Sequence, residues 1–476
     1  GGDVGGDDTP TTNTGSFYSP TSYSYRSGME NYNNLEKYSY YDCDSAPSTG
    51  DINVLVVPIA FSDSEADTST VIDDLETVFN GTEQETGWES VSSYFNKSSY
   101  GNLNLDFTIA PTWYQYEKTK SYMKIDNDGR TNTAVDSAVA WYKDKYSSNC
   151  QEFDSDSNGY IDCVFLVYAE MDYQVANSSR NNFWAYTSWT RNNNKNRTSP
   201  NANTYIWMSY DFMYGDFNGS TYIDLDAHTF IHEYGHAMGL DDYYDYGENE
   251  CSAGGFDMQD MNVGDHNPFS KMALGWSKPY VVNGDATITI KPASKYENQT
   301  ILIPAGGYNS WNKSPFDEYI LIEYFIAEGL NQFDIQHNTY GNYPRATTTP
   351  GLRVYHIDAR LCYHNGSYYQ GYADNVSSSY YYEVAASNTS SGDYQSAYAP
   401  DYRLVHLLSQ SGTDYMKKGS YMDENDLFLQ GDSFSMTSFE SYFYNSGKLN
   451  DGSNLGFTFT VKNITSEGAT IQFTKI

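Results

Sequence analysis

The residues with the clearest potential for chemistry lie between positions 230 and 244, in the stretch FIHEYGHAMGLDDYY. Here His232, Glu233 and His236 form the pattern H-E-x-x-H. Two histidines four residues apart lie on the same side of a helix, where both can bind one zinc ion. Glu233 follows the first histidine, in the place from which a general base takes a proton from metal-bound water. The spacing predicts a catalytic zinc site.

A third zinc ligand is expected just after this helix. Gly239 can leave the helix in a left-handed conformation and turn Asp242 back toward the histidines. Asp241 or a more distant carboxylate could supply the ligand instead. A single His or Asp would more often pack or face solvent, but the combination of residue types makes chance a poor explanation. His228, one turn before His232, is expected to pack or to face solvent.

A second group of candidate metal ligands precedes an apolar run, in the stretch FDSDSNGYIDCVFLVYAE. Oxygen-bearing side chains at alternate positions, then a glycine, give the ligand spacing of the first part of a calcium-binding EF-hand loop. Phe165 stands where an EF-hand has its final Glu, so we expect a shorter loop that continues directly into a strand. An ordinary polar turn is the alternative. The predicted calcium ligands are Asp154, Asp156, Asn158 and Asp162.

The elements that must position these groups predict an α+β fold. A Val-rich run at 52–61 is typical of a strand buried on both faces of a mixed sheet. Apolar residues at helical spacing predict helices at 71–79, 91–95 and 134–146. A turn into a strand is expected at 98–107 and another strand at 163–168, while Asp224 or Asp226 is the expected N-cap of the zinc helix.

After position 286 the pattern changes to short strands separated by turns, and helical periodicity is nearly absent. This predicts a β-sandwich domain. The expected organisation is a disordered linker at 1–20, an N-terminal extension at 21–50, a catalytic domain at 51–279 and the β-sandwich at 280–476. The strands are expected at 287–290, 300–303, 319–325, 352–357, 457–462 and 470–474.

Composition narrows the choice of partners. The 476 residues carry 27 basic and 62 acidic side chains, a net charge of -35. This charge makes nucleic acid and anionic membranes unfavourable partners. No apolar run is long enough to span a bilayer, so no transmembrane segment is expected. A surface rich in hydroxyl and amide groups indicates an extracellular protein, for which the polar N-terminal linker could be a tether.

Cysteine contributes little to this picture. The odd number of five Cys residues makes no disulfide framework, and none forms a C-x-x-C zinc pair. Cys43 precedes the first strong strand, and its thiolate could cap the zinc and hold an enzyme latent. A buried or disulfide-bonded Cys43 is the simpler interpretation.

Three stretches, HEYGHAMGLDDYYD, GGFDMQDMNVGDHN and FSKMALGW, together resemble the immune inhibitor A family of secreted bacterial metallopeptidases. These are metzincin-like zinc enzymes with the motif H-E-x-x-H-x-x-G-x-x-D. The upstream stretches VLVVPIAFSD, SYFNKSSYGNLNLDF and DSDSNGYIDCVFLVYA are also similar to that catalytic domain, so the resemblance covers positions 51–276.

The resemblance implies roles for particular residues. His232, His236 and Asp242 would bind the zinc, and Glu233 would act as base and then as acid. A methionine-containing turn beneath the zinc would fall at Met258 or Met261. His266 is a candidate catalytic residue by position, with a structural role as the alternative. The family also resembles this chain in carrying a β-rich segment after a metzincin-like zinc protease domain.

The function predicted from these features is that of a secreted or cell-surface zinc endopeptidase, expected to be a monomer. Its substrates would be proteins or peptides, including host and glycosylated extracellular proteins, cut by water that the zinc activates and Glu233 deprotonates. One alternative is a surface binding protein with a vestigial protease fold, although the intact Glu233 argues against it. A zinc hydrolase of a non-protein substrate is the other alternative, and it would keep the same residues.

Overall fold

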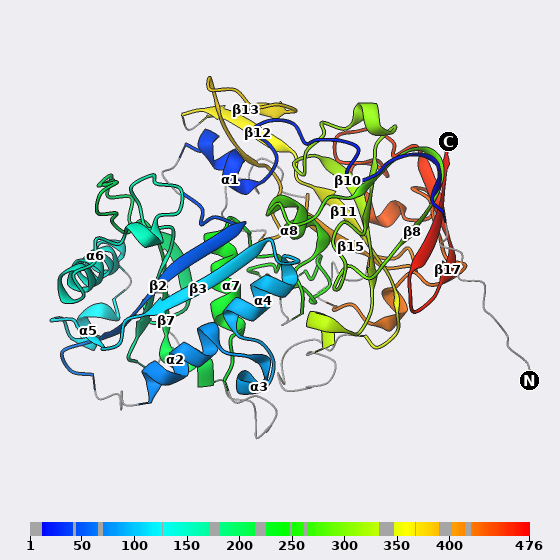
Figure 1. The fold of residues 1–476 in the computed structure, drawn as a ribbon. Coiled ribbons are helices and arrows are strands. Elements are labelled where there is room, and N and C mark those ends of the chain that lie inside the picture. The colour runs from blue at the N-terminus through cyan, green and yellow to red at the C-terminus, as the bar shows by residue number, and fades with distance from the viewer. Residues whose placement is uncertain are drawn as a thin grey trace, which may run out of the picture.

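The computed structural model describes residues 12–40, 44–64, 70–125, 127–170, 181–214, 225–247, 250–260, 264–332, 347–366, 368–389, 402–414 and 420–476. They form a mixed α+β structure, as the sequence predicts. Figure 1 shows helices packed on a sheet in the N-terminal half and a larger set of strands in the C-terminal half. Within the described ranges, no helix combines the length and the hydrophobicity needed to cross a membrane.

The N-terminal half is built on a six-stranded sheet in the order β3-β2-β5-β7-β6, with β4 also paired to β2. Its pairings are parallel except for β6, which runs antiparallel to β7 at the end of the sheet. The predicted buried strand is confirmed as β2. The strands are β2 (Gly50–Ala60), β3 (Leu103–Ile109), β4 (Tyr114–Gln115), β5 (Val164–Tyr168), β6 (Tyr186–Trp189) and β7 (Thr204–Ser209).

Helices cover both faces of this sheet because alternate residues of β2 point to opposite sides. Val54 and Val56 share a core with α2 (Val71–Asn80), α4 (Val91–Ser98) and α7 (His228–Ala237). Leu55 and Val57 share another core with α6 (Asp128–Lys145). The three helices predicted upstream of the zinc motif are therefore confirmed as α2, α4 and α6. The short helices are α1 (Tyr32–Leu35), α3 (Glu83–Thr86), α5 (Lys120–Met123) and α8 (Pro268–Ala273).

The C-terminal half contains a nine-stranded sheet in the order β15-β11-β10-β9-β8-β18-β17-β16, with β1 also paired to β8. A three-stranded sheet in the order β13-β12-β14 shares a core with part of it. The strands of the larger sheet are β1 (Thr14–Tyr18), β8 (Tyr280–Ile290), β9 (Thr300–Pro304), β10 (Glu318–Phe325), β11 (Gly351–Asp358), β15 (Val405–Leu408), β16 (Ser433–Phe434), β17 (Phe457–Ile464) and β18 (Ala469–Lys475). Those of the smaller sheet are β12 (Leu361–Asn365), β13 (Tyr368–Ala373) and β14 (Tyr381–Val384).

The predicted β-sandwich is wrong, because these strands form one curled sheet instead of two stacked ones. Strand β8 joins its two halves: Tyr280 and Val281 pair with β9, whereas the segment from Ala286 to Ile290 pairs with β18. Side chains from both halves, such as Ile322 on β10 and Phe459 on β17, then share one core. The strands predicted after position 286 are present, but their pairing differs from the prediction.

The N-terminal segment is also more ordered than predicted. Disorder was expected through position 20, yet Thr14–Tyr18 forms strand β1, which pairs with β8. Residues 1–11 lie outside the described ranges. The extension at 21–50 contacts both halves of the molecule, since the Ala46 amide donates to the Ala237 carbonyl and the Tyr23 hydroxyl donates to the Pro279 carbonyl.

Candidate metal centre

Helix α7 presents the H-E-x-x-H motif because its other face is apolar. Phe230, Ile231 and Tyr234 are buried in the core that α7 shares with α2 and α4. Ala227 is the N-cap, and the Asp226 side chain instead accepts a hydrogen bond from the amide of His228, two residues further on, at 2.9 Å. The prediction of Asp226 as the N-cap is therefore off by one residue, and Asp224 lies outside the described ranges. His228 is buried, which fits the packing role.

The chain returns toward the histidines through Gly239, as the sequence predicts. Gly239 has a φ of +112°, and its amide donates to the His236 carbonyl at 2.9 Å. A Cβ atom at this position would lie 3.1 Å from the Tyr32 side chain, so both the backbone angle and the close neighbour favour glycine. The turn delivers Asp242 to the histidines.

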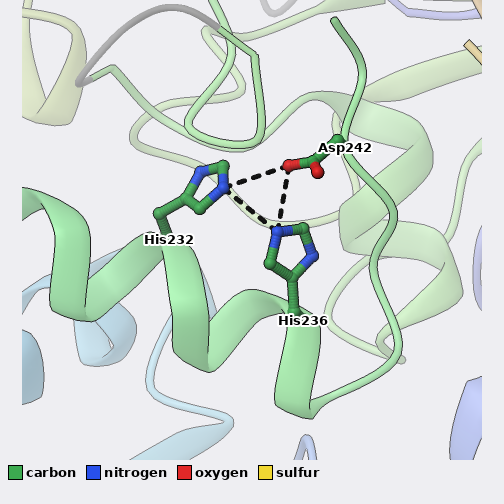
Figure 2. Close-up of side chains that lie close together, drawn as sticks. All are labelled: His232, His236 and Asp242. Atoms are coloured by element: carbon green, nitrogen blue, oxygen red, sulfur yellow. Dashed lines mark hydrogen bonds and ion pairs between the residues drawn. The ribbon is translucent and has the colours of Figure 1, made fainter. Parts of the chain in front are cut away.

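Figure 2 shows the three side chains converging, with His232 and His236 on α7 and Asp242 on the returning segment. The two Nε2 atoms lie 3.0 Å apart, and the Asp242 Oδ1 atom lies 3.1 Å from the His232 Nε2 and 3.0 Å from the His236 Nε2. A tetrahedral zinc ion with bonds of about 2.0–2.1 Å holds its ligand atoms about 3.4 Å apart. The observed triangle therefore fits three zinc ligands after a small expansion. Asp241, the alternative third ligand, is not part of this group.

The histidine rings are oriented by hydrogen bonds on their outer sides. The His232 Nδ1 donates to the Met258 carbonyl at 2.8 Å, and the His236 Nδ1 donates to the Leu240 carbonyl at 2.7 Å. A carbonyl can only accept, so in the neutral rings the protons are on Nδ1 and the Nε2 lone pairs face inward. Two lone pairs and a carboxylate oxygen at such short distances repel one another unless a proton or a metal cation lies between them.

The electrostatics of the cluster also favour a cation. Burial alone would raise the pKa of Asp242, but the charges and hydrogen bonds of His236 and His232 outweigh it and hold that pKa well below its usual range. Burial likewise lowers the pKa of His236, yet the Asp242 carboxylate outweighs it and raises that pKa to about 10. The raised pKa of His236 shows that the carboxylates around it favour a positive charge at this position, and the lowered pKa of Asp242 shows that its carboxylate stays ionised beside that charge.

Glu233 lies next to the cluster and is buried. The Thr187 hydroxyl on β6 lies 2.8 Å from the Glu233 carbonyl oxygen and 3.1 Å from its Oε2 atom. The carboxylate of Glu233 is thus held between α7 and the terminal strand of the six-stranded sheet. Sequence reasoning missed Thr187, since nothing in its local sequence distinguishes it from other strand residues.

A tyrosine hydroxyl also helps to orient the Asp242 carboxylate. The Tyr246 hydroxyl donates to the Asp242 Oδ2 atom at 2.9 Å, which leaves Oδ1 directed at the histidines. Tyr246 is 51% exposed, so it lies at the surface side of the cluster. It was also missed, because one Tyr in the stretch DDYYDY carries no separate signal.

The residues implied by the family resemblance fall in different places. Met258 is fully buried, and its carbonyl holds His232 as described above. Met261 lies outside the described ranges, as does Cys43. The ring of His266 contacts the Tyr94 hydroxyl at 2.9 Å and the Gln259 Oε1 at 3.1 Å, behind the turn that holds Met258. This geometry does not support a catalytic role for His266 and matches the structural alternative.

The predicted calcium ligands are brought together in part. Asp154, Asp156 and Asp162 each offer a carboxylate oxygen, and these oxygens lie within 4.8 Å of one another. The Asn158 Oδ1 instead accepts from the Tyr160 amide at 2.7 Å. Backbone amides donate to Asp154 and Asp162, and the loop continues into β5 as expected. The loop therefore gathers three acids where the sequence predicted four ligands.

The acids of this loop repel one another. Burial first, and then the charges of Asp156 and Asp154, raise the pKa of Asp162 to about 7. Burial also raises the pKa of Asp154. A hard cation that takes oxygen ligands would relieve this repulsion.

No protein-family model matches the sequence, and no curated protein matches it. The function is therefore inferred from the geometry of the cluster and from the sequence motifs.

Proposed function

We propose that this chain is a zinc-dependent endopeptidase. The observation that carries the proposal is the triangle of His232, His236 and Asp242, with inward-facing nitrogen lone pairs and Glu233 beside it. Two neutral imidazoles and one carboxylate, with room for a water, form the ligand set of a catalytic zinc site. Zinc held there would polarise the scissile carbonyl and lower the pKa of bound water toward about 7.

The residues of the chain would supply the proton transfers and the orientation. Glu233 accepts the proton of the attacking water and delivers it to the leaving amine. Thr187 holds Glu233 against β6, and the carbonyls of Met258 and Leu240 fix the two imidazole rings. A base that is already positioned loses less entropy on reaching the transition state.

The sheet supports a peptide as the substrate. Strand β6 ends the order of the six-stranded sheet and contacts the active-site helix through Thr187 and Glu233. A terminal strand can pair with an extended peptide through main-chain hydrogen bonds. Such pairing would lay a peptide bond alongside Glu233, which favours a peptidase over a zinc hydrolase of another bond. From the resemblance of the sequence motifs, we further propose that residues 51–279 form a metzincin-like catalytic domain of the immune inhibitor A type.

We propose that the loop of Asp154, Asp156 and Asp162 binds a structural calcium ion. Three acids that gather before a buried strand, and repel one another without a cation, support this assignment. Loops of this kind bind calcium at extracellular concentrations, which agrees with a secreted or cell-surface protein. The net charge of -35 favours protein substrates over nucleic acid.

The test compares the wild type with Glu233→Gln, which keeps the size of the side chain but removes the base. We expect the wild type to bind one zinc per chain and to cleave casein, and the variant to keep its zinc while cleavage falls by about 10²–10⁴-fold. A wild type that binds no zinc, or equal cleavage of casein by the wild type and the variant, would contradict the proposal. A wild type that binds zinc but cleaves no protein would favour the non-protein hydrolase or the vestigial binding protein.

A further inference from the structure

Gln259 contacts three separate parts of the metal centre although it is not a metal ligand. Its side-chain amide donates to the His232 carbonyl at 3.1 Å. Its backbone carbonyl accepts a hydrogen bond from the backbone amide of Tyr243, the residue that follows Asp242, at 2.9 Å. The side chain is completely buried, so these bonds are shielded from water.

The third contact is with Gly235, which lies inside the H-E-x-x-H motif. A Cβ atom at Gly235 would lie 2.2 Å from the Gln259 Oε1 atom and 2.8 Å from its Cδ atom. The Gln259 amide therefore fills the space that any other residue at position 235 would occupy. It packs against α7 between the two histidine ligands.

The hydrogen-bond network determines the orientation of this amide. The His232 carbonyl can only accept, so the Nε2 group of Gln259 faces it and the Oε1 atom faces His266. The His266 Nε2 lies 3.1 Å from that oxygen and must carry the proton. The His266 Nδ1 is then an acceptor for the Tyr94 hydroxyl, 2.9 Å away. The order of donors runs from Tyr94 through His266 and Gln259 to His232.

These hydrogen bonds form a relay from Tyr94 to His232, and the Tyr94 end of the relay lies on α4. Tyr94 is buried, and the rings of Phe95 and Trp276 pack around His266 with centroids 6.0 and 5.9 Å away. The Asp265 carboxylate accepts from the Ser98 hydroxyl on the same helix at 2.6 Å and from the His266 amide at 2.9 Å. The relay thus connects the metal centre to a rigid part of the core.

We propose that Gln259 is a positioning residue for the metal, and that His266 and Tyr94 act through it by fixing its amide. Gln259 binds the backbone of His232, fills the space beside Gly235 and binds the segment that carries Asp242. It thereby fixes these three parts relative to one another. The inference rests on the proposed function for the identity of the metal. It assigns a function to His266, whose ring nitrogens are both engaged away from the three ligands.

The test uses Gln259→Met, which nearly conserves volume but removes both amide bonds, and Tyr94→Phe, which removes only the hydroxyl at the far end. The matched control is Tyr442→Phe. Its buried hydroxyl accepts from the Ser409 amide at 2.8 Å in the C-terminal half, where Ser409 directly follows β15. Zinc Kd is measured by chelator competition, ligand geometry by the visible spectrum of the cobalt-substituted protein, and Tm on metal-free protein.

We expect Gln259→Met to raise the zinc Kd by about 10–100-fold and to shift the cobalt spectrum, as is usual when residues that support metal ligands are removed. Tyr94→Phe should cause a smaller change in the same direction. Tyr442→Phe should lower Tm without changing the Kd or the spectrum. Tyr94→Phe should add almost nothing in the Gln259→Met background, because the relay acts through the amide.

Three results would overturn the inference. The first is a Gln259→Met protein that loses Tm like the control but keeps the wild-type zinc Kd and cobalt spectrum. The second is full additivity of the two substitutions. The third, a wild type that binds no zinc, would also remove the proposed function, whereas the first two leave that function intact. If Gln259→Met does not fold, Tyr94→Phe against Tyr442→Phe decides between a positioning and a purely structural role.

Discussion

The two candidate metal sites of this chain are built in opposite ways. In the triangle of His232, His236 and Asp242, the two histidines are oriented from outside by backbone carbonyls that accept hydrogen bonds from their rings. In the acidic loop, backbone amides donate to the carboxylates, as the Gly159 amide does to Asp154 at 2.9 Å. The first arrangement presents nitrogen lone pairs, and the second presents oxygen with three negative charges.

This difference determines which ion each site prefers. Imidazole nitrogen with a single carboxylate suits zinc, whereas several hard oxygens suit calcium. It also separates their functions. The triangle lies beside a buried carboxylate and a terminal strand, where chemistry can occur. The acidic loop lies directly before a buried strand, and the calcium ion proposed there would support the fold. Substitutions in one site should therefore leave the other intact.

The largest expected effect comes from His236→Ala. Two ligands cannot hold zinc as three do, and the buried Asp242 loses the partner that contributes most to its low pKa. We expect no stoichiometric zinc in the purified variant and no measurable cleavage of casein. Metal content and cleavage are measured together. Stabilisation by calcium, read as the rise in Tm on adding calcium, should remain as in the wild type; its loss would show that the two sites are coupled.

The reciprocal substitution, Asp162→Asn, should remove the stabilisation by calcium. At a calcium concentration of about 100 times Kd, a site of this kind stabilises the folded protein by about 2.7 kcal/mol. We expect this gain to disappear in Asp162→Asn while zinc content stays at one per chain. Thermal unfolding with and without calcium measures the gain. A variant with wild-type stabilisation by calcium would place the ion elsewhere.

The acidic loop also predicts a dependence on pH. The pKa of Asp162 is raised to about 7 in the folded protein, mainly by burial, against about 3.9 in an unfolded chain. Between these values the folded state binds more protons, so without calcium its stability falls as pH rises from about 4 to about 7. Calcium needs the ionised oxygens, and its stabilising effect should therefore be larger at about pH 8 than at about pH 5.

Unfolding at both pH values, with calcium and with a chelator, tests this sign. Asp162→Asn is the matched control, since it lacks the titrating group and should show little difference between the two pH values. An equal gain from calcium at both pH values in the wild type would contradict a calcium site that depends on Asp162.

Sequence reasoning located the parts of both sites that depend on local spacing. The histidines of the motif share a helix face because they are four residues apart, and Gly239 returns Asp242 within a few residues. The acids of the proposed calcium site come together because they lie within one short loop. Asn158 was the exception, because its side-chain oxygen bonds to the nearby Tyr160 amide instead.

Long-range partners could not be predicted in this way. Thr187, Gln259 and Tyr94 reach the centre through contacts across 46, 27 and 172 positions of the chain. The same reason explains the error in the C-terminal half. Periodicity predicts that strands exist, but the pairing of β8 with β18, which made one sheet out of an expected two, depends on packing between distant segments. Strand β1 was missed because its residues are only half-buried or exposed.

The smallest effect is expected from Tyr246→Phe, which tests how the zinc triangle and the acidic loop differ in the groups that orient their carboxylates. Its hydroxyl donates to the Asp242 Oδ2 atom at 2.9 Å, and the Tyr244 side chain also hydrogen-bonds to Asp242, whereas the acids of the acidic loop receive backbone amides. Without it, Asp242 is less firmly oriented, and the zinc Kd should rise about 10-fold. Calcium stabilisation and Tm should hardly change, because Tyr246 is half exposed. Chelator competition measures the Kd, and Tyr296→Phe, another half-exposed tyrosine, is the control. An unchanged zinc Kd would mean that the Met258 and Leu240 carbonyls, together with the contacts of Gln259, suffice to orient the ligands.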